Sequence, residues 1–255
     1  MSIATIKSRE PKNNKFLYIL FLLLSGALIL VLHNFSIAQS NITKNAESGK
    51  FDYYVFAQAW YPTFCKGRPK GGCDDLSNYM KTDLAPHGLW PNLESKNHTT
   101  SYNTSCVKSP GCRDDYTCTM DAETIGPEVL AKIQNMMPTS LMNHEWKKHG
   151  TCTGLNQKEY FETILTLQNS HATPDFIKYN IGEYVTFNNI AQAFGGEKMV
   201  NIICKRKNKK QYLVEVHHFL DKNLTTIEKK YNATNNCKKN EEIYIATAES
   251  HKPIF

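Results

Sequence analysis

The segment FDYYVFAQAW, residues 51–60, is the clearest strand signal in the chain. It is rich in aromatic and β-branched side chains, which favour a buried strand. Two further segments, 198–205 and 211–219, alternate between apolar and polar residues around the short polar sequence 207–209. This pattern predicts an antiparallel hairpin. A last strand is expected within 243–248.

Helix signals lie between these strands. Helices are predicted to start at Gly126-Pro127, at Ser140, at Asn156, which forms a capping box with Glu159, at Thr173-Pro174 and at Thr186. The helix from Pro127 is predicted to end at Pro138, the helix from Asn156 at Leu167 and the helix from Thr186 at Gly195-Gly196. Residues 66–83 and 92–120 are predicted to be loops. Strands and helices mix without regular alternation or repeats. We therefore predict a single α+β domain over residues 51–255, with a central, mainly antiparallel sheet flanked by helices and stapled by disulfides.

The first 38 residues have the composition of a targeting segment. An uncharged stretch at 16–32, FLYILFLLLSGALILVL, follows a lysine-bearing start and precedes the small residues Ser36 and Ala38. This predicts a secretory signal peptide over 1–38, with an uncleaved N-terminal anchor as the alternative. Either way the body is expected to be secreted or periplasmic, and to meet a membrane only if the leader stays attached. Residues 39–50 are polar and are predicted to form a flexible lead-in.

Charge and cysteine content narrow the class of protein. The formal net charge is +6, of which the leader carries four basic residues and one acidic residue, so the body retains a mildly basic +3 that suits a polyanionic partner. All eight cysteines follow the leader: Cys65, Cys73, Cys106, Cys112, Cys118, Cys152, Cys204 and Cys237. An even number in an exported chain indicates disulfides. A structural zinc site would need CxxC pairs, and the sequence has none.

Two segments carry the candidate chemistry: PHGLWPN at 86–92 and HEWKKHGTC at 144–152. On a helix with about 100° per residue, four side chains of the second segment share one face within an arc of about 140°. They are His144, Glu145, Lys148 and His149. We expect His87 to approach this face from a separate loop, with Trp90 beside it as a flat surface on which bases stack.

This residue set fits the cleavage of RNA without a metal. Imidazoles exchange protons near neutral pH, and a lysine stabilises a transition state that carries negative charge. RNA supplies its own nucleophile, the 2′-hydroxyl, so neither a serine nor a cysteine nucleophile is needed. DNA lacks this group and would not react. Two alternatives remain: a zinc hydrolase, although His144 and His149 are five residues apart rather than four, and a binding protein that keeps the scaffold without catalysis.

The same residues resemble the ribonuclease T2 family. One family motif resembles HGLWP, here at 87–91, and another resembles HEWxKHGTC, here at 144–152 without a mismatch. The segment FAQAWYPTFC at 56–65 is similar to the first strand of the family. The resemblance extends from about Phe51 to the C-terminus, and it implies an α+β fold with a central antiparallel sheet.

The resemblance also implies roles for individual residues. His149 matches the general base, His87 the general acid and His144 the histidine that anchors the phosphate. Glu145 and Lys148 match the pair that stabilises the pentacoordinate intermediate. The implied substrate-binding positions are Trp90 and Asn92 at one base site and Gln58 at a second, with Leu141 standing where the family often has an aromatic residue.

The implied activity is that of a metal-independent endoribonuclease. It would cleave single-stranded RNA to a 2′,3′-cyclic phosphate and then to a 3′-phosphate, with low base specificity, no cofactor and no metal. We expect a monomer that does not act on DNA. By the same resemblance, the implied disulfides are Cys65–Cys73, Cys106–Cys112, Cys118–Cys152 and Cys204–Cys237.

Overall fold

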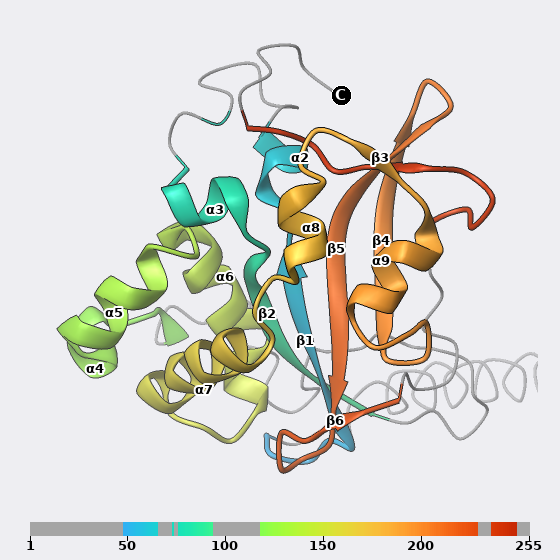
Figure 1. Ribbon diagram of the computed structural model, residues 1–255. Helices are drawn as coiled ribbons and strands as arrows, with labels where there is room; N and C mark the ends of the chain where they lie inside the picture. The colour runs from blue at the N-terminus through green and yellow to red at the C-terminus, as the bar shows by residue number, and fades with distance from the viewer. Residues whose placement is uncertain (1–47, 66–72, 74–75, 94–117, 229–235, 249–255) are drawn as a thin grey trace, which may run out of the picture. The chain divides into compact units, whose positions relative to one another are not determined.

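A sheet of seven strands lies at the centre of the residues that the computed structural model describes, namely 48–65, 73, 76–93, 118–228 and 236–248 (Figure 1). The strands are β1 (Tyr53–Ala59), β2 (Ala85–Asn92), β3 (Tyr184–Val185), β4 (Val200–Lys207), β5 (Lys210–Leu220), β6 (Thr226–Ile227) and β7 (Ile243–Tyr244). Their order is β2-β1-β5-β7-β3, and β4 and β6 also pair with β5. Only the β5–β7 pair is parallel among the described strands. The predicted α+β fold with a mainly antiparallel sheet is confirmed.

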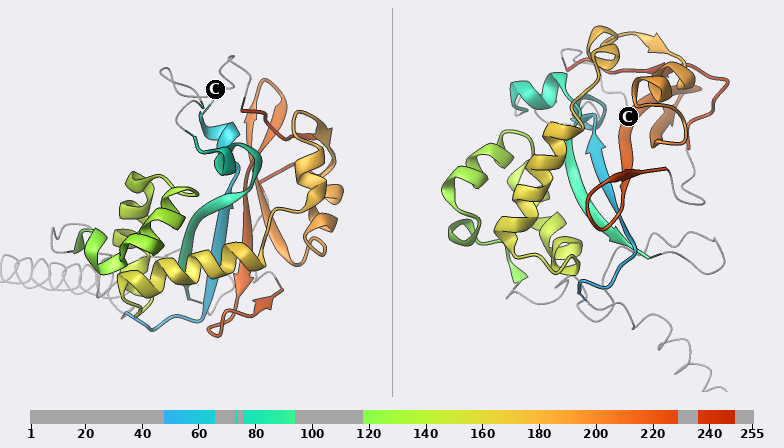
Figure 2. Two further views of the ribbon diagram at one scale, coloured as in Figure 1. Left: turned by 60° about the vertical axis from the view of Figure 1, so that its left-hand side comes forward. Right: turned by 60° about the horizontal axis from the view of Figure 1, so that its bottom comes forward.

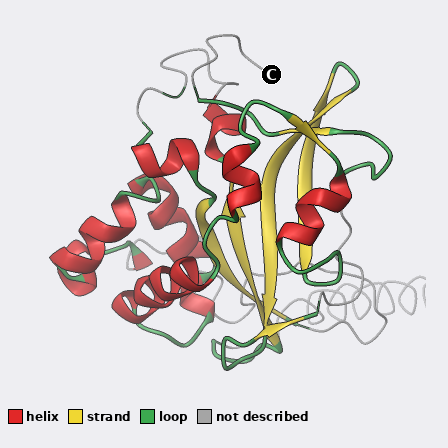
Figure 3. Cartoon of the chain, viewed as in Figure 1, coloured by secondary structure: helices red, strands yellow, loops and turns green. Residues whose placement is uncertain are grey.

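The described helices pack beside this sheet, and Figure 3 shows the sheet in yellow and the helices in red. They are α2 (Tyr61–Cys65), α3 (Asn78–Thr82), α4 (Ala122–Ile125), α5 (Pro127–Gln134), α6 (Thr139–Lys148), α7 (Gln157–Ser170), α8 (Asp175–Tyr179) and α9 (Phe187–Ala193). The predicted capping box of α7 is present, because the side chain of Asn156 accepts from the amide of Glu159, and Glu159 accepts from the amide of Asn156. Helices α4, α5 and α6 gather beside β2, the edge strand (Figure 2).

The two faces of the sheet have different surroundings. Successive side chains of a strand point to opposite faces, and Gln58 of β1 points toward α7, where it bonds to Gln168. Phe56 lies on the same face and packs in a core with side chains of α4–α7. Val55 points to the other face, where it packs in a smaller cluster with Trp90 of β2. The second face is the one that carries the candidate site.

Several elements differ from the sequence prediction. The HGLWP segment forms strand β2 rather than a loop, and α3 lies within the predicted loop 66–83. Helix α6 begins at Thr139, with Pro138 at its N-cap position, so Ser140 is not the cap. The last strand is limited to Ile243–Tyr244. Strand β4 starts and ends two residues later than predicted, and β5 is longer by one residue at each end. Asn208 between them adopts a positive φ of 51°, which fits a tight hairpin turn.

The structure tests part of the predicted disulfide framework. Cys204 of β4 is bonded to Cys237, as the resemblance implied. Cys73, Cys118 and Cys152 are also disulfide-bonded, while their pairings stay predictions. Cys106–Cys112, the leader and most of the lead-in lie outside the described residues. Within the described ranges, no helix combines the length and apolar character needed to cross a membrane.

Candidate active site

A β-bulge in β2 positions His87. Gly88 lies opposite Ala57 of β1 and Pro86 lies opposite Gln58, so His87 is an extra residue without a partner in the register. Strict alternation would turn His87 and Gly88 to opposite faces, whereas a bulge re-aims the side chain at this point. The imidazole of His87 consequently contacts residues of the second face, and its side chain is 24% exposed.

Glu145 lies at the centre of the site. It belongs to α6, which packs beside β2, and its side chain is only 2% exposed. One carboxylate oxygen, Oε2, accepts a hydrogen bond of 2.7 Å from the indole N–H of Trp90. The other, Oε1, lies 3.5 Å from Nε2 of His87. Burial raises the pKa of Glu145 to about 7, although His87, Trp90 and the charge of Lys148 act in the opposite direction.

His149 enters the same site from the end of α6. It is the C-cap residue, with φ −125° and ψ −46°, and a 3₁₀ turn over Gly150–Cys152 follows it. Its Nε2 lies 3.8 Å from Oε2 of Glu145. Gly150 is required for this turn, because a Cβ there would lie 2.3 Å from the ring of Trp146. The chain therefore leaves the helix at the residue whose imidazole joins the site.

The indole ring of Trp90 connects three imidazoles. Its centroid lies 5.4 Å from the ring of His87, 5.4 Å from that of His149 and 5.2 Å from that of His217. The two imidazoles predicted to exchange protons thus converge on one side of the molecule. Sequence reasoning had assigned them to a loop and a helix, whereas they belong to a strand bulge and a helix C-cap.

Two residues of β5, Glu215 and His217, also belong to the site, although they lie outside the two motifs. Oε1 of Glu215 lies 2.7 Å from Nδ1 of His87, and Oε2 lies 2.7 Å from Nε2 of His217. Burial alone would raise the pKa of Glu215, but the hydrogen bonds with both imidazoles lower it to about 2. The available signal was the Glu-x-His spacing on a buried strand, which places both side chains on one face.

The protonated form of His87 is favoured in this environment. Burial acts to lower the pKa of His87, but the hydrogen bond with Glu215 and the negative charges of Glu215 and Glu145 outweigh it and raise the pKa. Lys148 acts in the opposite direction. An imidazole that holds its proton near neutral pH is suited to act as an acid.

The remaining predicted residues lie in different surroundings. His144 is exposed and Lys148 is half-buried on α6. Asn92 is buried, and its amide donates to the backbone carbonyl of Trp90. Leu141 is half-buried and packs against two apolar clusters.

The structure does not place Gln58 where the resemblance implied. Its side chain is fully buried on the opposite, helix-covered face. Its amide donates to Gln168 and to the carbonyl of His171, and its oxygen lies 2.8 Å from Nε2 of His218. All its polar groups are therefore occupied inside the core. A direct contact between Gln58 and a base has no support in this structure.

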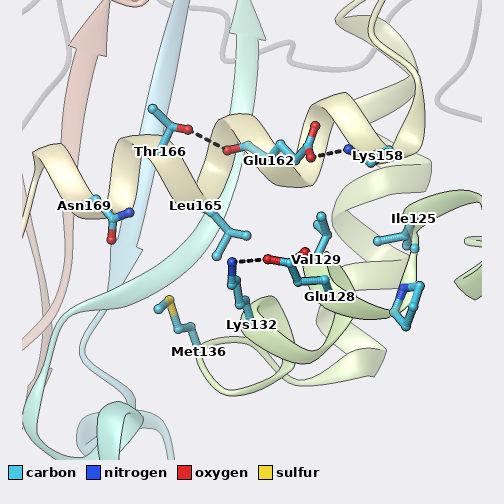
Figure 4. Close-up of a pocket in the computed structure, with 12 residues that line it drawn as sticks. Ile125, Glu128, Val129, Lys132, Met136, Lys158, Glu162, Leu165, Thr166 and Asn169 are labelled. Atoms are coloured by element: carbon cyan, nitrogen blue, oxygen red, sulfur yellow. Dashed lines mark hydrogen bonds and ion pairs between the residues drawn. The ribbon is translucent and has the colours of Figure 1, made fainter.

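A separate groove lies between α5 and α7, and none of the site residues lines it (Figure 4). It has a volume of about 940 Å³, and Val129 and Leu165 form part of its apolar lining. Its charged residues form ion pairs within each helix, such as Lys132 with Glu128 at 2.7 Å. The groove contains no imidazole, so it does not compete with the first site as a catalytic centre. Across the described residues, no three His, Cys, Asp or Glu side chains are placed to share a metal ion.

Fold and site together define an α+β protein with imidazoles and carboxylates gathered on one face of a mainly antiparallel sheet. The sequence model of the ribonuclease T2 family matches residues 51–242. The chain therefore belongs to the ribonuclease T2 family.

Individual relatives agree with this assignment. The chain is 29% identical to a ribonuclease of Aeromonas hydrophila over 53% of each chain, and 31% identical to ribonuclease 1 of Arabidopsis thaliana over 52% of this chain and 56% of the relative. It thus spans about half the length of these curated relatives. A longer match, at 26% identity, covers 75% of this chain and 84% of ribonuclease I of Escherichia coli. The fold resembles that of RNase NT, with a TM-score of 0.58, 21% identity and coverage of 78% and 99%.

Proposed function

We propose that this protein is a metal-independent endoribonuclease that cleaves single-stranded RNA by transphosphorylation. One observation carries the proposal: His87 and His149 come from different elements, flank the same Glu145 carboxylate and lie equally close to the ring of Trp90. Two imidazoles at one site can remove a proton from one oxygen and deliver a proton to another.

The reaction proceeds in two steps. His149 takes the proton of the ribose 2′-hydroxyl, the 2′-oxygen attacks phosphorus, and the bond from phosphorus to the 5′-oxygen breaks. His87 gives its proton to that 5′-oxygen, which leaves as a hydroxyl, and the other product is a 2′,3′-cyclic phosphate. Water then opens the cyclic phosphate to a 3′-phosphate, with the two imidazoles in exchanged roles.

Charges around the scissile phosphate support this assignment. Lys148 is near enough to act on the pKa of both Glu145 and His87, so its ammonium can stabilise negative charge that develops in the transition state. His144 lies on the same helix and is exposed, where it can anchor a phosphate of the bound strand.

Base recognition is expected to be weak. Trp90 offers an aromatic ring for stacking, which is tolerant of base identity. Gln58 is occupied inside the core, and Leu141 offers no aromatic ring. Among solved structures of similar fold, RNase NT is a complex with 5′-AMP and a mutant of RNase MC1 is a complex with 5′-GMP. A nucleotide site with low base specificity fits these observations.

The proposal includes a secreted or periplasmic location, which two observations support. The Cys204–Cys237 disulfide forms readily in oxidising compartments. A relative from tomato is an extracellular ribonuclease by name.

The decisive experiment is digestion of a homopolyribonucleotide in EDTA by the purified protein, with the matching deoxy polymer in parallel. We expect cleavage of RNA alone and a cyclic phosphate that ³¹P NMR detects before the 3′-phosphate. His87→Ala and His149→Ala are each expected to lower kcat/KM by about 10²–10⁴-fold or more.

His171→Ala serves as the matched control, since this imidazole packs on the helix-covered face with Phe56. It should keep wild-type activity. Near-normal cleavage by either catalytic variant would refute the roles. A folded wild-type protein that cleaves no RNA from acid to neutral pH would instead indicate a binding protein, and activity lost only in EDTA would indicate a metal enzyme.

A further inference from the structure

Strand β5 places one carboxylate between two imidazoles. Glu215 and His217 are two residues apart and therefore face the same side of the sheet. The two oxygens of Glu215 lie 2.7 Å from Nδ1 of His87 and 2.7 Å from Nε2 of His217. The side chains of Glu215 and His217 are 11% and 9% exposed, so water competes little for these bonds.

The ionised state of Glu215 fixes the protons of both imidazoles. With a pKa of about 2, the carboxylate is a hydrogen-bond acceptor only. Nδ1 of His87 and Nε2 of His217 must therefore both carry hydrogen and donate to it. The remaining nitrogen of His87, Nε2, lies on the side of Glu145, at 3.5 Å from its carboxylate. Nε2 is thus the atom through which His87 exchanges protons.

We propose that Glu215 is the positioning residue of His87, holding its ring with Nε2 directed to the reacting phosphate and stabilising its protonated form, while His217 fixes the second oxygen of Glu215. Glu215 does not touch the substrate in this arrangement and acts through His87. The inference deepens the proposed function and rests on it, because it concerns the imidazole that protonates the leaving oxygen.

The groups that face His87 determine how it responds to pH. Trp90 faces it from β2, Glu145 and Lys148 from α6 with His149 at its C-cap, and Glu215 with His217 from β5. The two carboxylates favour the imidazolium, while burial and the charge of Lys148 disfavour it. Without the charge of Glu215, only Glu145 still opposes burial and Lys148. His87 must then lose its proton at lower pH.

The variant Glu215→Gln tests this directly, since an amide keeps the shape and removes the charge. NMR of the ¹⁵N-labelled His87 ring should show its titration midpoint falling by about 1–3 pH units. The alkaline limb of the kcat/KM profile should move to lower pH by the same amount, with KM nearly unchanged. Glu215→Asp retains the charge and should restore most of the midpoint, yet keep a lowered kcat because the carboxylate no longer reaches both rings.

Glu128→Gln is the control, because this exposed carboxylate of α5 pairs only with Lys132 among the described residues. It should leave both readouts unchanged. An unshifted His87 midpoint in folded Glu215→Gln would overturn the proposal. NMR of the wild-type protein gives a second test, in which the neutral ring of His87 is expected to carry hydrogen on Nδ1. Hydrogen on Nε2 instead would also overturn the proposal. The NMR shift with no RNA cleavage by the wild type would reject the proposed function alone.

Discussion

At the scale of single residues, burial of Glu145 makes its ionised form unfavourable. Its carboxylate is buried against Trp90 and two imidazoles, and burial raises its pKa to about 7. A group whose folded pKa exceeds its unfolded value contributes stability below the unfolded pKa. That contribution is lost as the pH rises through the folded pKa. For Glu145 the loss falls between about pH 4.5 and pH 7.

Glu145→Gln is therefore expected to gain stability relative to wild type as the pH rises. The shift corresponds to about 2–3 kcal/mol in the free energy of unfolding between pH 4 and pH 8. Urea denaturation at both pH values measures it, and kcat/KM should fall at least about tenfold because the carboxylate is part of the site. An equal stability difference at pH 4 and pH 8 would contradict the raised pKa.

The sequence identified the residues of two short motifs but not their partners in β5. His87, Glu145 and His149 lie close together, as the two motifs predicted. His217 lies against Trp90 and Glu215, although it belongs to neither motif. Which of two adjacent histidines faces the site depends on the register of β5 with β1. A one-residue shift of this register would turn His218 to the site instead of His217, and no local sequence pattern predicts the register.

At the scale of elements, the contact of α6 with β2 depends on Gly88. A Cβ at this position would lie 2.1 Å from Oε2 of Glu145 and 2.5 Å from Nε1 of Trp90. The absence of a side chain thus lets the carboxylate lie directly over the strand. Gly88 does not have a positive φ, so its role is steric and not conformational.

Gly88→Ala is expected to fold while displacing Glu145 from the site. A shift of about 1 Å at a catalytic group can lower the rate by about 10²-fold, which kcat/KM on a dinucleotide substrate measures. Gly196→Ala gives the contrasting control, since that position has open space but a φ of +112°. It should lose stability through backbone strain and keep its activity. Comparable activity in the two variants would refute the steric role.

Helices were easier to predict than the strand that carries His87. The capping box of Asn156 with Glu159 marks the start of α7 by local chemistry alone. By contrast, His87 has Pro86 directly before it and Pro91 four residues after it, which argues against a central strand. Proline is tolerated here because β2 is an edge strand in the described sheet. That position follows from pairing between distant segments.

At the scale of the whole molecule, the Cys204–Cys237 disulfide links β4 to the C-terminal part of the chain. The two cysteines are 33 residues apart and belong to the apolar core under α8 and α9. This core lies on the face opposite the active site. The bond should therefore stabilise the fold without acting on the chemistry.

The double variant Cys204→Ala with Cys237→Ala is expected to lower the free energy of unfolding by about 3–4 kcal/mol, from the entropy of the opened loop. Denaturant titration under non-reducing conditions measures this change. At temperatures where the variant remains folded, kcat/KM should equal that of wild type. A tenfold loss of kcat/KM there would show that the two faces are coupled.

The overall architecture was predictable because composition and alternation report on fold class directly. The parallel pairing of β5 with β7 was not, since Gln211 and Ile243, which lie opposite each other, are distant in sequence. Which face of the sheet carries the site could not be predicted either, because it depends on contacts between residues distant in sequence. The roles of the two faces depend on the helices that pack against one of them.

The bulge at His87 has a consequence for variation in chain length. One additional residue between Pro86 and Gly88 sets the direction of the imidazole. Deletion of Pro86 would place His87 opposite Gln58, restore regular pleating and turn the imidazole toward the hydrophobic interior. Substitutions in this stretch can reduce activity to different degrees, whereas an insertion or deletion changes the direction of the His87 imidazole altogether. Homologous or engineered sequences should therefore vary in length at the loops and not within residues 85–88 of β2.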